Sequence, residues 1–164
     1  MRSEGENDRG HDASGPYREG KYSSYEGGTR VPLVFSWPGK ISPGVSNALV
    51  GQMDFLASFA SLLDIEIPEG EAKDSRNLLS TFMGESEEGV DYLLQGFKTL
   101  GGLRYKHWKY IPARKNKNQP EQLYNLDLDA AEQNNLIGQY PEVTQHMRDM
   151  LAKILEAEAM NVFD

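Results

Sequence analysis

A charged, glycine-rich loop that leads into an apolar run is the feature that most constrains how this chain can fold. Four glycines fall between Gly15 and Gly28, and glycine lets a backbone turn tightly or approach a ligand closely. The apolar run Val31–Trp37 follows and is bounded by Pro32 and Pro38, a composition that predicts a buried strand. Because a charged loop that enters a core strand is a good place to bind an anion, we expect an anion site here.

The residues of this loop form a longer pattern. It begins with Gly20-Lys21, continues as Tyr-Glu-Gly-Gly-Thr-Arg-Val-Pro over residues 25–32 and ends with Trp-Pro-Gly over residues 37–39. This pattern resembles the lysine loop of the formylglycine-dependent sulfatases, which are the arylsulfatase family of the alkaline-phosphatase-like superfamily. The resemblance continues at residues 123–126 (Leu-Tyr-Asn-Leu) and 132–136 (Glu-Gln-Asn-Asn-Leu). It covers nearly all of the chain after residue 14, and it matches only the C-terminal part of a sulfatase.

The resemblance implies a role for the loop lysine. Lys21 would contact the sulfate group or its bridging oxygen, and a compact ammonium charge suits that contact. It is therefore the candidate catalytic residue, although a solvent-facing lysine in a loop is the alternative. Glu26 can pair with Arg30 or accept hydrogen bonds from loop amides, and either contact would hold Lys21 in position. Arg18 is a candidate for substrate binding.

Two adjacent residues in the second half of the chain, His107 and Trp108, are candidates for contact with a sugar. His107 and Trp108 lie next to each other in a predicted hairpin, and an aromatic ring beside polar groups suits carbohydrate. Packing in a core or hinge is the alternative for Trp108. The basic residues between Arg104 and Lys117 predict a solvated rim of the same hairpin.

The resemblance also implies the chemistry of an intact enzyme. It would hydrolyse a sulfate ester of a carbohydrate or an aryl group, with calcium and formylglycine as cofactors and with positive groups stabilising the charge that develops on oxygen. The family's formylglycine and metal ligands would lie on polypeptide that this chain lacks. We therefore expect no metal ligand, no bound cofactor and no activity in this fragment alone. The alternatives are a module that binds a glycan or polyanion without catalysis, and a related phosphoester or phosphonate hydrolase.

Composition narrows the class of partner. The net charge is -8, from 25 acidic and 17 basic residues, which argues against a nucleic-acid surface. The chain has no cysteine, which excludes disulfides and thiolate metal sites within it. It has no apolar run near the roughly 20 residues that a membrane helix needs, so we expect no membrane partner. The resemblance implies a periplasmic or secreted intact protein.

The chain divides into three parts, and an α+β fold is expected. Residues 1–14 are polar and predict loop or disorder. The resemblance implies that residues 15–88 are the remnant of a large α/β catalytic domain and that residues 89–164 form a small α+β subdomain. In this subdomain a four-stranded antiparallel sheet packs against a C-terminal helix. The predicted helices are Phe55–Leu63, with Asp54 as its cap, Arg76–Met83, ended by Gly84, and Pro141–Ala159. The predicted strands are Asp91–Phe97, Thr99–Tyr105, Trp108–Pro112 and Gln122–Leu126.

The remnant has a consequence for association. The strand predicted at Val31–Trp37 has lost its sheet neighbours if the rest of the domain is missing. We therefore expect the fragment to self-associate or to leave its first part loosely ordered.

Overall fold

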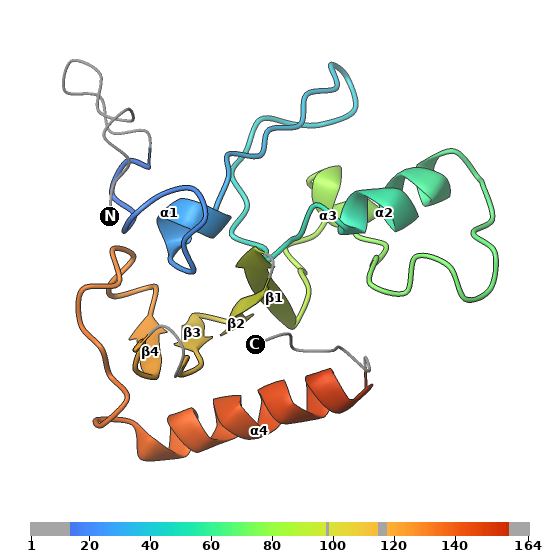
Figure 1. Ribbon diagram of the computed structural model, residues 1–164. Helices are drawn as coiled ribbons and strands as arrows, with labels where there is room; N and C mark the ends of the chain where they lie inside the picture. Colours follow the sequence, from blue (N-terminus) through green and yellow to red (C-terminus); the bar gives the residue numbers. More distant parts are fainter. Residues whose placement is uncertain (1–13, 98, 115–117, 158–164) are drawn as a thin grey trace. The chain divides into compact units, whose positions relative to one another are not determined.

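The structure is a computed structural model that describes residues 14–97, 99–114 and 118–157 (Figure 1). The described residues up to Val31 and from Leu94 onward form one compact unit, here called the sheet unit. Pro32–Leu93 form a second, here called the middle unit. The loop predicted at residues 1–14 falls outside the described residues except for Ser14, which lies in a turn. The division into a remnant at residues 15–88 and a subdomain at residues 89–164 stays a prediction.

Four strands build the predicted antiparallel sheet. They are β1 (Tyr92–Phe97), β2 (Thr99–Tyr105), β3 (Trp108–Ile111) and β4 (Gln122–Asn125), in the spatial order β1-β2-β3-β4 (Figure 1). The register pairs Arg104 with Lys109, and Lys109 with Tyr124. Because side chains alternate between the faces of a strand, these three side chains share one face of the sheet. The four-stranded sheet and the α+β class are confirmed.

The other face of the sheet packs against the C-terminal helix α4 (Pro141–Ala157). Leu103, Tyr110 and Leu123 alternate onto this face, and Leu103 and Leu123 are fully buried. The helix contributes a buried apolar stripe of Met147, Leu151 and Ile154. Its spacing of three and four residues gives the stripe, which confirms the predicted helix as far as residue 157. The last two predicted helical residues lie outside the described part of the chain.

The middle unit contains two helices and a small aromatic cluster. Helix α2 (Asp54–Leu62) confirms the predicted helix to within one residue at each end, whereas α3 (Leu79–Phe82) is shorter than the predicted helix Arg76–Met83. Residues 76–78 are not helical, and two of their amides donate to the side chains of Asp54 and Ser58 instead of to a helical carbonyl. Gly84 ends α3 with φ +74°, as predicted. The rings of Phe35, Phe55, Phe59 and Phe82 pack together with centroids 4.9 to 6.5 Å apart.

Two predictions for the middle unit are wrong. Asp54 does not cap α2; its buried carboxylate accepts hydrogen bonds from the amides of Gly51 (2.7 Å) and Arg76 (3.0 Å) and so joins two loops. Val31–Trp37 is not a strand, and Val34 is 86% exposed. A strand forms only where a neighbour satisfies its backbone groups, and no strand of the described residues pairs with this segment.

Within the described residues, no helix is both long enough and apolar enough to cross a membrane.

Candidate functional site

The loop that carries Lys21 folds back on a single helical turn, α1 (Glu26–Thr29), and two glycines make this possible. A Cβ atom on Gly27 would lie 2.3 Å from the carbonyl oxygen of Glu19, and one on Gly28 would lie 2.5 Å from that of Ser23. The Gly27 amide donates to the carbonyl of Arg18 at 3.1 Å. The loop backbone is therefore clamped against α1, and only glycine at these two positions permits the contact.

Lys21 lies at an exposed position of this loop. Glu19 and Tyr22, on either side, have φ values of +56° and +73°, in the left-handed region that side chains disfavour. The Nζ atom of Lys21 lies 5.0 Å from the centroid of the Tyr22 ring, and no carboxylate of the described residues forms an ion pair with it. The contacts of Gly27 and Gly28 thus fix the loop backbone near Lys21, and the exposed ammonium is accessible to an external anion.

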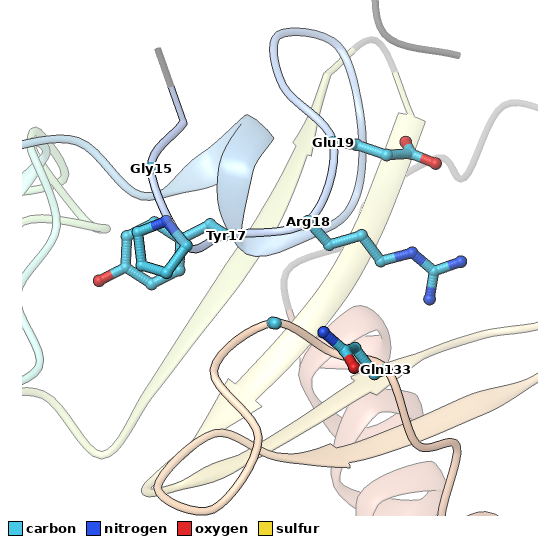
Figure 2. A pocket seen from close by; sticks show the side chains of 7 residues that line it. Gly15, Tyr17, Arg18, Glu19 and Gln133 are labelled. Atoms are coloured by element: carbon cyan, nitrogen blue, oxygen red, sulfur yellow. The ribbon is translucent and has the colours of Figure 1, made fainter. Parts of the chain in front are cut away.

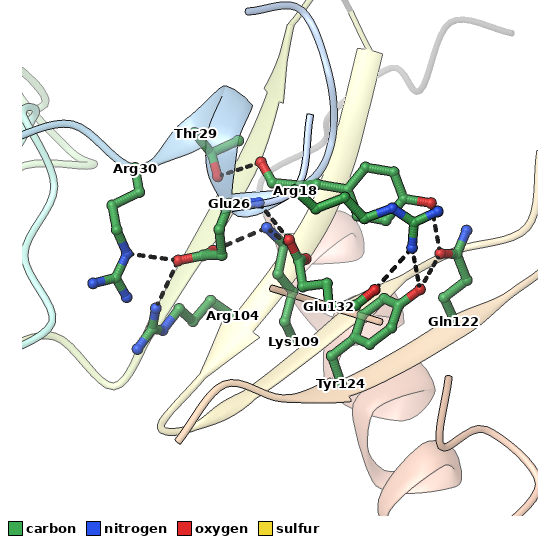
Figure 3. Close-up of polar contacts among 10 residues, drawn as sticks. Arg18, Glu26, Thr29, Arg30, Arg104, Lys109, Gln122, Tyr124 and Glu132 are labelled. Atoms are coloured by element: carbon green, nitrogen blue, oxygen red, sulfur yellow. Dashed lines mark hydrogen bonds and ion pairs between the residues drawn. The ribbon is translucent and has the colours of Figure 1, made fainter. Parts of the chain in front are cut away.

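The helical turn is attached to the sheet by a buried cluster of charges (Figure 3). Glu26 is 1% exposed, and its carboxylate accepts from three cations. Oε2 lies 2.8 Å from Arg30 Nε and 3.2 Å from Arg104 Nη1, whereas Oε1 lies 2.9 Å from Lys109 Nζ. The predicted contact between Glu26 and Arg30 is therefore present, and two further cations join it from the sheet.

Lys109 links this carboxylate to a second one. It is fully buried, and its Nζ lies 3.3 Å from Oε1 of Glu132, which is also fully buried. Oε2 of Glu132 accepts the backbone amide of Glu26 at 2.6 Å. Glu132 therefore binds α1 at its backbone while Lys109 binds it at its side chain, so both hold the same turn from the sheet unit.

The two carboxylates differ in their electrostatic environment. Burial favours a raised pKa for Glu26, but Lys109, Arg30 and Arg104 outweigh it and lower the pKa below the usual 4.5. Burial raises the pKa of Glu132, and the attraction of Lys109 offsets this only in part. The cluster thus contains one firmly ionised carboxylate and one that binds a proton more readily.

The Arg18 side chain is bound to residues in and next to the charge cluster. Its Nη1 donates to the hydroxyl of Tyr124 (3.2 Å) and to the backbone carbonyl of Glu132 (2.8 Å), and its guanidinium carbon lies 3.9 Å from the centroid of the Tyr25 ring. Arg18 lines an open depression of about 490 Å³. The other residues that line it are Gly15, Pro16, Tyr17, Glu19, Ala131 and Gln133. Figure 2 shows the Arg18 side chain with those of the other lining residues. A contact of Arg18 with substrate stays a prediction.

His107 and Trp108 lie apart from this group. The Trp108 ring is 5.1 Å from that of His107 and 5.3 Å from that of Tyr140, which directly precedes α4. Trp108 alternates onto the face of the sheet opposite to Lys109, so the structure does not bring it together with Arg18. These contacts are those of a packed residue, and the sugar-binding role of both residues stays a prediction.

Sequence reasoning missed three residues of the cluster: Arg104, Lys109 and Glu132. The prediction of a solvated basic rim is wrong for Arg104, whose side chain is 15% exposed, and for Lys109, because the register turns both toward Glu26. A signal was present, since Lys109 stands between aromatic residues in a strand and Glu132 belongs to the second stretch of resemblance. This signal could not be interpreted from the sequence, because Lys109 pairs with Glu26, which lies far away in the chain.

The described residues do not fit a metal centre. No group of three or more His, Cys, Asp or Glu side chains among them is arranged to hold a metal ion. Glu26 and Glu132 are occupied by cations and backbone amides of the chain itself.

Comparisons with known proteins agree on one family. The family model described as Sulfatase matches residues 6–65, a range that includes the whole Lys21 loop. An N-acetylgalactosamine-6-O-sulfatase of Bacteroides thetaiotaomicron is 37% identical over 159 residues, which are 88% of this chain and 31% of that protein. Human arylsulfatase A is 29% identical and covers 88% of this chain, with 34% of its own length matched.

Solved structures give the same result. A Bacteroides thetaiotaomicron protein described in connection with the metabolism of multiple glycosaminoglycans matches with a TM-score of 0.76 and 37% identity, over 85% of this chain and 32% of that one. Ps i-CgsB in complex with k-i-k-neocarrahexaose matches with a TM-score of 0.65 and 26% identity, over 88% of this chain and 33% of that one. The chain therefore spans about a third of the length of the relatives it matches.

Proposed function

The chain belongs to the sulfatase family and corresponds to the C-terminal portion of its members, and on this premise we propose that a full-length enzyme containing it hydrolyses sulfate esters. The observation that carries this proposal is the presentation of Lys21. The lysine lies exposed on a loop that two glycines clamp to α1, and α1 is in turn fixed to the sheet by buried ion pairs. A cation held in this way is suited to meet a tetrahedral anion.

The contribution of Lys21 is electrostatic. Cleavage of a sulfate ester builds negative charge on the leaving oxygen, and an ammonium group already in place lowers the barrier because it needs little reorganisation. We propose that Nζ of Lys21 contacts either a sulfate oxygen or the bridging oxygen. No group of the described residues is arranged to hold calcium, which the family uses, and we propose that the calcium site and the family's formylglycine both belong to the remainder of the enzyme. This chain alone would then be inactive.

We further propose a sulfated carbohydrate as substrate. Support comes from the relatives, one of which is named an N-acetylgalactosamine-6-O-sulfatase and another of which was solved in complex with k-i-k-neocarrahexaose. An aryl sulfate is the second candidate, because arylsulfatases are also among the relatives. A periplasmic or secreted location is part of the same proposal.

The non-catalytic alternative has less support. It needs the basic hairpin to face solvent as a surface for a polyanion, whereas Arg104 and Lys109 turn toward Glu26 inside the protein. No observation on the described residues favours a phosphoester or phosphonate hydrolase over a sulfatase.

The proposal is tested by Lys21→Ala in the full-length enzyme. Loss of one positioned charge at the developing oxyanion is expected to lower kcat about 100- to 1000-fold, with a near-normal far-UV circular dichroism spectrum. Turnover is measured with a sulfated disaccharide and an aryl sulfate. Lys73→Ala, at an exposed lysine of the middle unit, is the matched control and should retain full activity. An unchanged kcat in Lys21→Ala would remove this lysine from the mechanism.

A further inference from the structure

We propose that Lys109 is a positioning residue for Lys21, acting through Glu26 from the opposite side of α1. The proposal rests on the function proposed above and adds a residue that the sequence did not single out. The ion pairs of Lys109 are with Glu26 and Glu132, not with residues of the loop before α1. Its ammonium is fully buried between two carboxylates, one of which belongs to α1.

The path from Lys109 to the loop lies entirely within the sheet unit, and Figure 3 shows its first step, from Lys109 to Glu26. Lys109 Nζ holds the Glu26 carboxylate at 2.9 Å. Glu26 begins the α1 turn, and the next residue, Gly27, binds the carbonyl of Arg18 and lies against the carbonyl of Glu19. The loop backbone immediately before Lys21 is therefore seated on the residue that follows the anchored glutamate.

The α1 turn depends on this anchor because it is too short to be stable alone. A helix of four residues closes at most one turn, and the closing of a first turn is unfavourable in isolation. Its buried anchor is polar, since Glu26 is its one buried residue and lies among the charges of the sheet. A buried ion pair fixes geometry tightly, because any displacement leaves a desolvated charge without a partner.

Among the three cations on Glu26, Lys109 is the one that fixes α1 to the sheet. Arg30 belongs to the same turn and is 42% exposed, so this pair moves with α1 and is weakened by solvent. Arg104 is farther away, at 3.2 Å, and 15% exposed. Lys109 alone combines full burial with contacts to both Glu26 and Glu132, and Glu132 holds the Glu26 backbone amide as well.

The test uses the full-length enzyme and a double-mutant cycle. Lys109→Met is expected to lower kcat about 10- to 100-fold, the range typical of residues that orient a functional group from behind, while KM changes little. In a Lys21→Ala background, the same substitution is expected to cause no further loss of kcat, since the group that Lys109 positions is already absent. A merely structural loss of folded enzyme would instead lower kcat by the same factor in both backgrounds.

Two variants separate positioning from folding. Leu103→Ala weakens the same sheet from the face that packs on α4, and it should leave kcat unchanged at a temperature where the enzyme stays folded. Glu26→Gln combined with Lys109→Met removes both charges of this pair with little change in volume. Glu132 then loses its cation, but burial already raises its pKa, so this carboxyl takes up a proton instead of remaining as an unpaired buried charge. This double variant is expected to fold and to show the same low kcat as Lys109→Met, so it decides the question if the single variant does not fold.

The outcomes distinguish this inference from the proposed function. Wild-type kcat in the folded double variant, or additive losses in the cycle, would overturn the positioning role while leaving the function of Lys21 intact. An unchanged kcat in Lys21→Ala would remove Lys21 from the mechanism, and the positioning role would fall with it. The proposed function itself would be overturned if the wild-type full-length enzyme turned over neither the sulfated disaccharide nor the aryl sulfate.

Discussion

The two compact units of this chain differ in how far they bury their apolar side chains. In the sheet unit, Leu103, Ile111, Leu123 and Met147 are fully buried between sheet, helix and loop. In the middle unit, the buried apolar residues of the described chain are Ala60 and Phe82, whereas Val34, Val45 and Leu63 are 86%, 92% and 65% exposed. The sheet unit closes its own core, and the middle unit presents apolar side chains that nothing in the described chain covers.

The units also differ in what polar groups do inside them. In the sheet unit, buried charges attach a loop to an already complete sheet. In the middle unit, buried Asp54 and Ser58 hold loop amides in place of a larger core, and Ser58 Oγ accepts the Leu78 amide at 2.8 Å. The comparison indicates that the sheet unit is the self-sufficient part of the chain, and that the middle unit is shaped for a partner surface that we propose to be the rest of a sulfatase domain.

Hydrogen exchange should show the largest difference between the two units. Amides of β2 and β3 bond within a closed sheet and are expected to exchange only on global unfolding, whereas amides of residues 31–37 have no ladder partner and should exchange almost freely. The opening free energies should therefore differ by nearly the whole stability of the sheet unit, on the order of 5 kcal/mol or more. Exchange of this chain is followed residue by residue by NMR.

A second measurement tests whether the exposed apolar residues of the middle unit cause the chain to self-associate. Size-exclusion chromatography over a range of concentrations should show self-association if the exposed apolar residues find one another. A compact monomer at every concentration, together with slow exchange over residues 31–37, would contradict the account of the middle unit given above.

Core truncations should give the next largest difference. Leu103→Ala removes a fully buried side chain from the sheet unit and should lower the free energy of unfolding by about 2 to 5 kcal/mol. Leu63→Ala, at an exposed position in the middle unit, should change it by no more than about 0.5 kcal/mol. Urea unfolding measures both variants. Equal losses would mean that the middle unit buries Leu63 in solution.

The smallest expected effect is on the pH dependence of stability, where Glu26 and Glu132 should act with opposite signs. Because the pKa of Glu132 is raised in the folded chain, its ionisation weakens folding as pH rises through that pKa, so Glu132→Gln should gain stability relative to wild type between pH 4 and neutral pH. The pKa of Glu26 is lowered, so its contribution is present above the usual 4.5 and is lost as pH falls through the lowered value. Glu26→Gln should therefore be destabilising at neutral pH, and less so in acid.

Urea unfolding of both variants across this pH range provides the check, and each variant serves as the control for the other. The same sign of pH dependence in the two would mean that their environments do not differ as the structure indicates.

Much of the fold could be predicted because its signals are local. The four strands and the helices α2 and α4 follow from side-chain spacing within a few residues, and Gly84 marks the end of α3 by its own backbone preference. The strand prediction for Val31–Trp37 was wrong because a strand depends on a signal that is not local. The composition of this segment is that of a strand, but a strand also needs a neighbour, and composition contains no information about whether a neighbour is present.

The candidate site shows the same limit. The pairing of Glu26 with Arg30 was predictable because the two residues lie one helical turn apart. Lys109 was not, because 83 residues separate it from Glu26 and a lysine in a basic hairpin usually faces water. Asp54 likewise looked like a cap from its immediate neighbours, but its carboxylate accepts from the amides of Gly51, before the helix, and Arg76, well beyond it.

The family resemblance, most of the local elements and the candidate Lys21 could be recognised from the amino-acid sequence, since each depends on residues that are close in the chain. Which charges are buried, and what they hold, depends on how distant segments meet in the folded chain. A buried charge is stable only with a partner of opposite sign, and the strand register of the folded sheet is what delivers Lys109 to Glu26 and Glu132.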